Sequence, residues 1–246
     1  MNAQVTAAYN GHAASLSHRR GLVLARRLTC RTDEPLFHEG DAIDHRYEVV
    51  SGAVRACKLL PDGRRQILEF YLPGDVFGDD ELDTCHGFSA EAAGIDETVL
   101  LQTRQRPMAA HTAVDPETML RMRDQALRSL DMTRSRLLIL GRLEAPERLA
   151  AFLLEMELRL VGRPPAREAT PFVLPISRRD AADYLGITPE TLSRCIQDLR
   201  RRAVIDVVRQ RQVTILDRRT LVDMSCGAAA FSGGCPGHAQ RLPAVA

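Results

Sequence analysis

Short runs of β-forming residues separated by glycine turns occupy residues 34–101. Apolar, β-branched and aromatic residues partly alternate with polar ones in each run, which is the pattern of a strand with one buried face. The expected strands are Tyr47–Val50, Val54–Leu60, Arg65–Tyr71 and Thr98–Gln102. Turn signals such as Ser51-Gly52 and Asp62-Gly63 recur between them. Regularly spaced hairpins fold into a sandwich or barrel, so this region is predicted to be a β-roll.

A long helix is predicted over residues 116–140, which contain neither Gly nor Pro after Pro116. Its seam consists of Met119, Met122, Ala126, Leu130 and Leu137. A seam of this kind also occurs on helices that pack against their own domain. Because the other faces are charged, we favour a two-stranded coiled coil and expect a homodimer. A further amphipathic helix is predicted at Ala145–Leu160.

Two short helices joined by a tight turn are predicted between residues 177 and 202. Ser177 is the expected N-cap of the first helix, with Asp180 as the acidic partner of a capping box. The inward positions of this helix are Ala181, Ala182 and Leu185. Gly186 is expected to end it, because the backbone there needs a positive φ.

The second helix of this pair has one apolar and one polar face. Thr188 is its expected N-cap, and Pro189 falls in the first turn, where a missing N–H is tolerated. The positions expected to face the core are Leu192, Ile196 and Leu199. The positions that remain on the solvent face are Glu190, Ser193, Arg194 and Gln197.

The polar face of the second helix suits DNA, because a helix-turn-helix places such a face in the major groove. Arginine can donate two bonds to guanine and a carboxylate can accept from cytosine, so Glu190, Ser193 and Arg194 are the expected base readers. Strands at Val204–Val208 and Gln212–Leu216 flank a basic tip that is typical of a wing. The expected DNA-backbone residues are Ser177, Arg178, Arg179, Thr188, Gln197, Arg209 and Arg211. An ordinary helical hairpin is the alternative, and the base-competent residues favour DNA.

Together these elements predict an α+β chain with five parts. They are a flexible arm at 1–22, a β-roll at 23–112, a dimerisation helix at 113–141, a winged helix-turn-helix domain at 142–223 and a disordered tail at 224–246. The net charge of +1 is unevenly distributed: residues 177–219 hold ten arginines and six acids, whereas residues 75–97 hold eight acids and no Lys or Arg. The basic segment is a suitable surface for DNA phosphates.

Several classes of protein do not fit the sequence. No apolar run approaches the ~20 residues that cross a bilayer, and the N-terminus lacks a signal segment, so we expect a cytoplasmic protein without a membrane partner. The six cysteines are scattered and are expected to be reduced thiols. Enzyme motifs such as G-x-S-x-G and H-E-x-x-H are absent. The sequence around the carboxylates of Asp79–Glu81 also lacks the pattern of histidines or metal ligands that a catalytic site needs. We therefore expect no enzymatic activity.

Two segments carry a resemblance to a known family: YEVVSGAVRACKLLPDGRRQILEFYLPGDVFG (Tyr47–Gly78) and ITPETLSR (Ile187–Arg194). With them, residues 23–222 resemble the Crp/Fnr family of bacterial transcription regulators, and the E-x-x-S-R spacing resembles its FixK-like, Fnr-type branch. The resemblance implies a cyclic-nucleotide-binding-like jelly roll and a homodimer on a palindromic operator with TTGAT-like half-sites. It also implies contact with RNA polymerase and activation of genes for low-oxygen respiration, denitrification or nitrogen fixation.

The effectors of other family members do not fit this chain. Nucleotide-binding members use a Phe-Gly-Glu segment and a following Arg-Ser/Thr-Ala, which correspond here to Phe77–Glu81 and Phe88–Glu91. Phe88 stands at the arginine position, and the surrounding acids would repel a phosphate. Iron–sulfur members use closely spaced N-terminal cysteines, whereas Cys30 is the only cysteine in the first 50 residues. We therefore expect no cofactor.

Without a dedicated effector, activity would be set by the expression level, and three alternatives remain open. Cys195 follows Arg194, so an exposed thiol there would have a lowered pKa and be open to oxidation, although a buried packing role is the simpler interpretation. A metal site at Cys226, Cys235 and His238 is less favoured than a disordered tail. A haem-dependent sensor of nitric oxide or redox state is the other alternative. Its candidate ligands are His12, His18, His38, His45, His86 and His111.

Overall fold

The computed structural model describes residues 25–63, 65–78, 85–104, 119–162, 169–209 and 211–225, with gaps at 121–122, 124–126, 128–129, 131–132, 135 and 138. Its contacts divide the chain into two compact units. The first consists of Met1–Ala110 with Pro175–Asp180, and the second of His111–Leu174 with Ala181–Ala246. The predicted N-terminal arm and nearly all of the predicted C-terminal tail lie outside the described residues.

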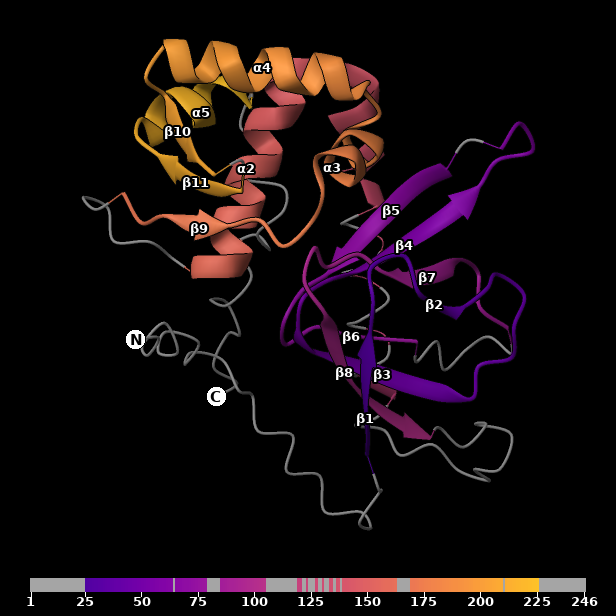
Figure 1. Ribbon diagram of the computed structural model, residues 1–246. Coiled ribbons are helices and arrows are strands. Elements are labelled where there is room, and N and C mark those ends of the chain that lie inside the picture. Colours follow the sequence, from indigo (N-terminus) through magenta and orange to yellow (C-terminus); the bar gives the residue numbers. More distant parts are fainter. Residues whose placement is uncertain are drawn as a thin grey trace, which may run out of the picture. The chain divides into compact units, whose positions relative to one another are not determined.

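The first unit is a β-roll of two four-stranded antiparallel sheets (Figure 1). One sheet has the order β1 (Arg26–Cys30), β8 (Thr98–Arg104), β3 (His45–Ser51) and β6 (Val76–Phe77). The other has the order β2 (Pro35–Phe37), β7 (Ser89–Ala92), β4 (Val54–Leu59) and β5 (Arg65–Tyr71). The sequence prediction of a β-roll is therefore confirmed.

Four of these eight strands were predicted from the sequence. The runs expected at 47–50, 54–60, 65–71 and 98–102 form β3, β4, β5 and β8, with ends that differ by up to two residues. Strands β1, β2, β6 and β7 were not predicted. Strands β2 and β6 have three and two residues, which is too short for an alternating pattern to be recognised. Strand β7 reads SAEA and lacks the β-branched and aromatic residues that mark a strand.

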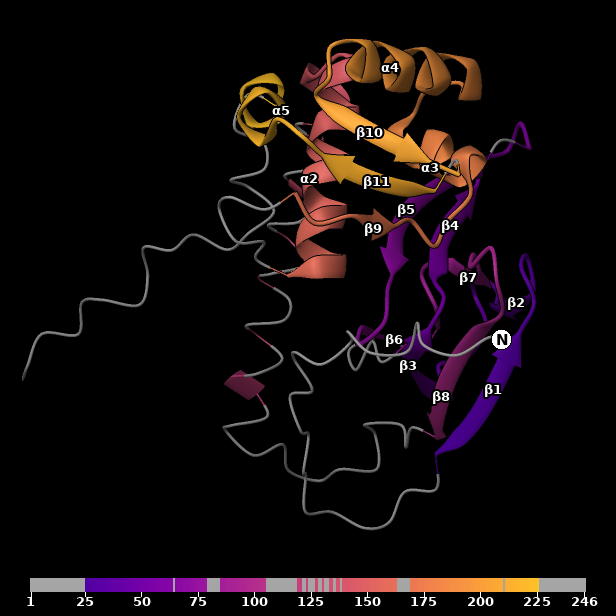
Figure 2. The ribbon, with the colours of Figure 1, turned by 60° about the vertical axis from the view of Figure 1, so that its left-hand side comes forward.

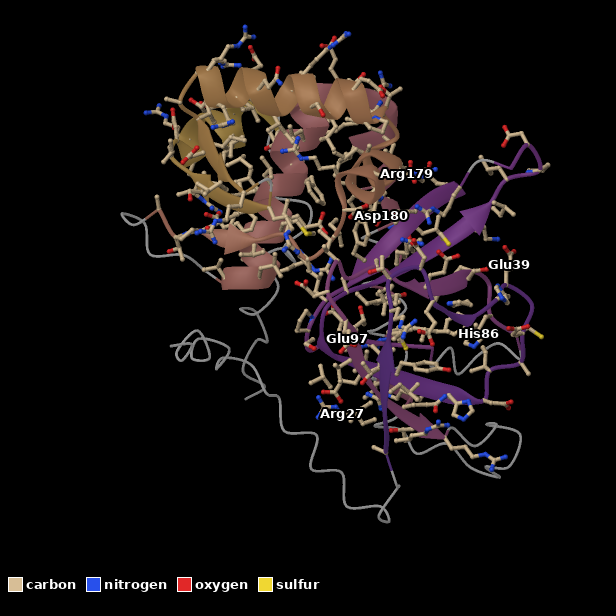
Figure 3. The ribbon with its side chains drawn as sticks, in the orientation of Figure 1. Arg27, Glu39, His86, Glu97, Arg179 and Asp180 are labelled. Carbon is tan, nitrogen blue, oxygen red and sulfur yellow. The ribbon has the colours of Figure 1, made fainter. Side chains whose placement is uncertain are left out.

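The core of the β-roll joins the inner faces of both sheets. Its buried members are Cys30, Phe37, Tyr47, Val49, Val54, Phe77, Ala90, Ala92 and Leu100. Phe77 stacks on Tyr47 and on Tyr71, with ring centroids 5.3 and 4.5 Å apart. Phe37 stacks on the buried imidazole of His86, whose place in the roll is labelled in Figure 3, at 3.5 Å. Aromatic rings thus fill the space between the sheets.

A buried arginine forms an ion-pair cluster in the first unit. Arg55 on β4 is 2% exposed and donates to Asp33 and Glu91 at 2.5 Å each and to Asp180 at 3.1 Å. Arg65 on β5 also donates to Asp180, at 2.8 Å. Burial lowers the pKa of Arg55, but the hydrogen bonds with Asp33 and Glu91 and the charges of Asp180 and Glu91 together outweigh it and raise the pKa above its ordinary value. Three carboxylates therefore surround two arginines in this unit, with Asp180 buried and Asp33 largely exposed.

The second unit combines helices with a small sheet. Its helices are α2 (Ala145–Val161), the C-terminal part of α3 (Arg178–Leu185), α4 (Pro189–Arg201) and α5 (Arg218–Met224). Its sheet has the order β10 (Ile205–Val208), β11 (Gln212–Ile215) and β9 (Phe172–Val173). Figures 1 and 2 show α2 passing beneath α4, which forms an outer edge of the unit. The helix predicted at 145–160 is confirmed as α2.

Helix α2 is the central support of the second unit. Its buried face includes Leu149, Phe152 and Met156. Helix α5 packs on it through buried Leu221 and an ion pair between Arg218 and the buried carboxylate of Glu157. No helix among the described residues combines the length and the apolar composition of a membrane span.

The described residues between 119 and 142 are helical, and two non-helical residues, Leu143 and Glu144, separate them from α2. Three of the five predicted seam residues are described. Met119, Leu130 and Leu137 are 61%, 44% and 67% exposed in the single chain, whereas Met122 and Ala126 lie outside the described residues. Exposed apolar side chains at these positions suit a contact with a second copy, and the dimer interface stays a prediction.

Candidate DNA-binding surface

Helices α3 and α4 form the predicted helix-turn-helix. The backbone of Gly186 has φ = +63°, and the amide of Ile187 donates to Ala182 O at 3.1 Å, which is the hydrogen bond of a Schellman ending. Thr188 caps α4, because its hydroxyl accepts from the Thr191 amide at 3.2 Å, and Pro189 is the first helical residue. The predicted turn, cap and proline are therefore all confirmed.

The N-terminus of α3 is capped by Ser177, as predicted. The Ser177 hydroxyl accepts from the Asp180 amide at 3.0 Å and donates to the Asp180 carboxylate at 2.8 Å. The expected reciprocal bond of a capping box is replaced, because Asp180 is buried and its other carboxylate oxygen accepts from Arg55 and Arg65. The neighbouring Arg178 and Arg179 are exposed, and Figure 3 labels Arg179 beside Asp180 on this helix.

The buried stripe of α4 differs from the prediction at one position. Leu192 and Leu199 are buried as expected, but the third buried residue is Cys195, whereas Ile196 is only half-buried. Residues 192, 195 and 199 follow the 3- and 4-residue spacing of a helix face. Ile196 was predicted because residues 192, 196 and 199 also fit the spacing of a helix face, whereas the direction of α4 places the smaller Cys195 thiol against the core.

The environment of Cys195 contradicts the lowered pKa that a redox switch would require. The side chain is 8% exposed, and burial, followed by the charge of Asp198, raises the pKa of its thiol. Nearby arginines do not reverse this shift. The packing role is therefore the one that the structure supports. Within the described residues no cluster of His, Cys, Asp or Glu could hold a metal ion, and Cys226, Cys235 and His238 lie outside them.

The opposite face of α4 presents polar side chains to solvent. Glu190, Arg194 and Gln197 are exposed and Ser193 is half-exposed. Hydrogen bonds from the Glu190 amide and from Thr188 lower the pKa of the Glu190 carboxyl, and the charge of Arg194 contributes further. Glu190 therefore stays ionised and remains a hydrogen-bond acceptor. A carboxylate and a guanidinium thus stand one helical turn apart near the N-terminus of α4.

The predicted wing is present as the hairpin of β10 and β11. Val208 pairs with Gln212, and the intervening tip contains Arg209, which is exposed with φ = +49°, and the half-buried Arg211. A third strand, β9, pairs with β11 and was not predicted, since two residues give no pattern. It holds the base of the wing through Gln212 opposite Val173.

Helix α4 also ends in a Schellman motif, but without a glycine. The Val204 amide donates to Leu199 O at 2.9 Å and the Ala203 amide to Arg200 O at 3.0 Å, so Ala203 is the left-handed residue, with φ = +52°. A side chain is disfavoured in this backbone conformation. The end of the second helix is therefore under local backbone strain.

We expect Ala203→Gly to stabilise the second unit by about 1 kcal/mol, because glycine adopts positive φ without a steric cost. The matched control is Gly186→Ala at the equivalent position of α3, which should destabilise by a similar amount. A Cβ there would make only ordinary contacts, 3.5 Å from Arg148 Nη1 and 3.7 Å from Leu140 Cδ2. Calorimetric melting of the full chain measures both changes, and a lower melting temperature for Ala203→Gly would contradict the assignment.

Two further arginines bind the C-terminal end of α3, and the sequence did not predict this role for them. Arg136 donates to Tyr184 O at 2.6 Å, and Arg148 donates to Leu185 O at 3.0 Å. Both carbonyls belong to the last residues of α3. Arginine is the common basic residue of this chain, with Lys58 as its single lysine, so residue type alone did not distinguish these two.

Comparison with known proteins agrees with this architecture. A Crp-like helix-turn-helix domain model matches residues 147–224, and a cyclic nucleotide-binding domain model matches residues 27–129. The chain is 40% identical to the nitrogen fixation regulation protein FixK of Bradyrhizobium diazoefficiens over 75% of its own length and 76% of that protein. It is 38% identical to the FixK protein of Azorhizobium caulinodans, covering 86% and 85% of the two chains.

A solved structure supports the same assignment. FixK2 from Bradyrhizobium japonicum matches with a TM-score of 0.73 and 37% sequence identity, over 82% of this chain and 98% of that one. The similarity thus includes both the β-roll and the helix-turn-helix. The chain belongs to the FixK-like branch of the Crp/Fnr family of DNA-binding transcription regulators, and it is not an enzyme.

Proposed function

We propose that this protein is a dimeric transcription activator that binds an inverted repeat with TTGAT-type half-sites. The observation that carries the proposal is the pair formed by Glu190 and Arg194, which are exposed one turn apart near the N-terminus of α4. Arg194 would donate to O6 and N7 of guanine, and the ionised Glu190 would accept from the amino group of cytosine. Ser193 would bond a base or contact a thymine methyl group.

The DNA backbone would be bound around this reading pair. Residues proposed for phosphate contacts are Ser177, Arg178, Arg179, Thr188, Gln197, Arg209 and Arg211. They lie at the start of α3, along α4 and at the tip of the wing, which is where a winged helix-turn-helix meets the two strands. Two copies joined through the long helix would hold their recognition helices ~34 Å apart, so a palindromic operator is expected.

The FixK proteins to which this chain is similar are named regulators of nitrogen fixation. We infer activation of genes for nitrogen fixation, denitrification or low-oxygen respiration, through contact with RNA polymerase. In this proposal residues 23–112 are the β-roll domain, 113–141 the dimerisation helix and 142–223 the DNA-binding domain. The exposed Met119, Leu130 and Leu137, with Met122 and Ala126, would form the dimer seam.

Charge and packing in the β-roll support a regulator without a cyclic nucleotide. Glu91 follows the stretch where other members hold the phosphate, and it accepts from both Arg55 and Arg65, at 2.5 and 3.4 Å. The cluster that these residues share with Asp33 and Asp180 contains one more carboxylate than guanidinium, so an added phosphate would meet net negative charge. The aromatic rings around Phe77 occupy the space between the sheets.

The proposed regulator also holds no iron–sulfur cluster. Such clusters are held by thiolates, and Cys30 is buried with a pKa that is raised by burial and by the charge of Glu34. The proposal therefore includes no resident cofactor. If the purified protein bound haem, the proposal of a regulator without a cofactor would be replaced by that of a haem-dependent sensor.

Selection from random duplex DNA by the purified full chain tests the proposal. We expect enrichment of a two-fold inverted repeat whose half-sites contain the TTGAT-like G·C pair, and an absorption spectrum of the purified protein without a haem Soret band. Enrichment of sequences without two-fold symmetry would contradict dimeric reading. A Soret band that appears with stoichiometric haem would instead support the haem-dependent sensor.

A further inference from the structure

Arg148 occupies the junction between the long helix, α2 and α3. It lies in the first turns of α2, and its guanidinium donates three hydrogen bonds to backbone carbonyls. Nε donates to Leu143 O at 2.8 Å, Nη2 to Leu140 O at 2.8 Å and Nη1 to Leu185 O at 3.0 Å. Each of its three nitrogens therefore has an acceptor, and all these residues belong to the second unit.

The three acceptors come from two helix endings. Leu140 is in the last turn of the long helix, Leu143 is in the break that follows it, and Leu185 is the last residue of α3. Carbonyls at helix C-termini have no partner within the helix and carry the negative end of the helix dipole. Two such endings at one place would repel each other. A permanently charged, planar guanidinium between them satisfies the carbonyls and offsets this repulsion.

A second arginine strengthens the same junction. Arg136, on the long helix, donates from Nη2 to Tyr184 O at 2.6 Å, and its guanidinium carbon lies 3.1 Å from the centroid of the Tyr184 ring. The Tyr184 hydroxyl in turn contacts the carboxylate of Glu155 on α2, at 3.3 Å. Successive carbonyls of α3, those of Tyr184 and Leu185, are thus held by arginines from the long helix and from α2.

The orientation of α3 determines that of the recognition helix. Only Gly186, Ile187 and Thr188 separate α3 from α4, and the Schellman bond from Ile187 to Ala182 fixes the turn between them. The long helix is the proposed dimer contact. The position of each recognition helix in the dimer therefore depends on how it is held against the end of this long helix, which we call the reference helix. Arg148 contacts both the end of this reference helix and the end of α3.

We propose that Arg148 is a positioning residue for DNA reading, which fixes the direction of the helix-turn-helix relative to the dimer helix and thereby sets the half-site spacing that the protein accepts. This inference rests on the proposed function, since it assumes a dimer joined through the long helix. Arg148 itself need not contact DNA. Its removal should loosen the spacing requirement while the reading face of α4 stays intact.

The test compares the full-length wild type with Arg148→Met, Arg148→Lys and the control Arg219→Met. Methionine keeps the aliphatic length and removes every donor, and Arg219 is an exposed arginine of α5, in the same unit and away from the carbonyls that Arg148 binds. Fluorescence anisotropy measures affinity for the selected inverted repeat, for the same repeat with one or two base pairs added to or removed from its centre, and for a single half-site.

The wild type should prefer the correct spacing by about 100-fold or more, which is the lower end of the gain from binding two sites at once. Arg148→Met should reduce this preference to about tenfold or less, with single half-site affinity within about twofold of wild type. Arg148→Lys should fall between them, because an ammonium keeps the charge but cannot reach three separate carbonyls. Arg219→Met should retain the wild-type preference.

An unchanged spacing preference in a folded Arg148→Met or Arg148→Lys protein would overturn the proposal and leave Arg148 as a stabilising cap. If Arg148→Met melts below the assay temperature, the Lys variant decides on the same criterion. A wild type that binds a single half-site as tightly as the repeat would instead show that the proposed dimeric reading is wrong. The two failures are therefore distinguishable.

Discussion

Replacing Arg194 by alanine should remove the preference for guanine at one position of each half-site, with a loss of about 1–3 kcal/mol per half-site. The reason is geometric: Arg194 is exposed near the N-terminus of α4, where a recognition helix meets base edges, and alanine can make no hydrogen bond to guanine. Affinity for the wild-type operator and for operators with this G·C pair replaced by each other pair measures the effect.

The matched control for Arg194 is an arginine proposed to contact only the DNA backbone. Arg209→Ala, at the exposed tip of the wing, should weaken all duplexes to a similar degree and reduce the slope of log affinity against log salt by about 1 per contact. If Arg194→Ala kept the wild-type preference for the G·C pair and lost only general affinity, α4 would not be the reading helix that we propose.

Replacing Leu130 by aspartate should convert the dimer to a monomer. The side chain is 44% exposed in the single chain, and in the proposed seam its carboxylate would be buried against the symmetry-related copy without a partner. A monomer holds one half-site at a time, so operator affinity should fall by about 10²–10⁴. Analytical ultracentrifugation and operator binding by the full chain provide the two measurements.

The control for this change is Leu130→Met, which conserves volume and hydrophobicity and should retain the dimer and its operator affinity. Circular dichroism of both variants checks that the domains remain folded. A dimer that persists unchanged in Leu130→Asp would move the interface away from the seam of Met119, Leu130 and Leu137.

Much of the reading domain follows from local signals in the sequence. Ser177, Gly186, Thr188 and Pro189 each act within a few residues of their own backbone, so their roles do not depend on distant parts of the chain. The same holds for the wing, where two alternating runs flank a basic tip. These features were predicted from the sequence, and the structure confirms the caps, the turn and the hairpin.

Features that depend on distant residues were missed or misjudged. Ile196 was predicted to be buried, but Cys195 is buried in its place. The orientation of α4 on its neighbours, rather than hydrophobicity, decides which of these two adjacent residues faces the core. The short strands β2, β6 and β9 exist because longer strands supply their hydrogen-bond partners. Arg55 lies in the predicted strand Val54–Leu60, where the sequence does not mark it, and only the fold brings Asp33, Glu91 and Asp180 to it.

The sequence by itself determined that this protein is a β-roll followed by a long helix and a helix-turn-helix, and which side chains of α4 face solvent. Hydrophobic periodicity, capping residues and turn glycines act over a few consecutive residues, so the sequence alone reveals them. Only the tertiary structure decided how these elements are joined. The carbonyls that Arg148 binds lie 5 and 8 residues before it and 37 residues after it. Such a contact follows from the packing of three helices, and no pattern in the chain specifies it.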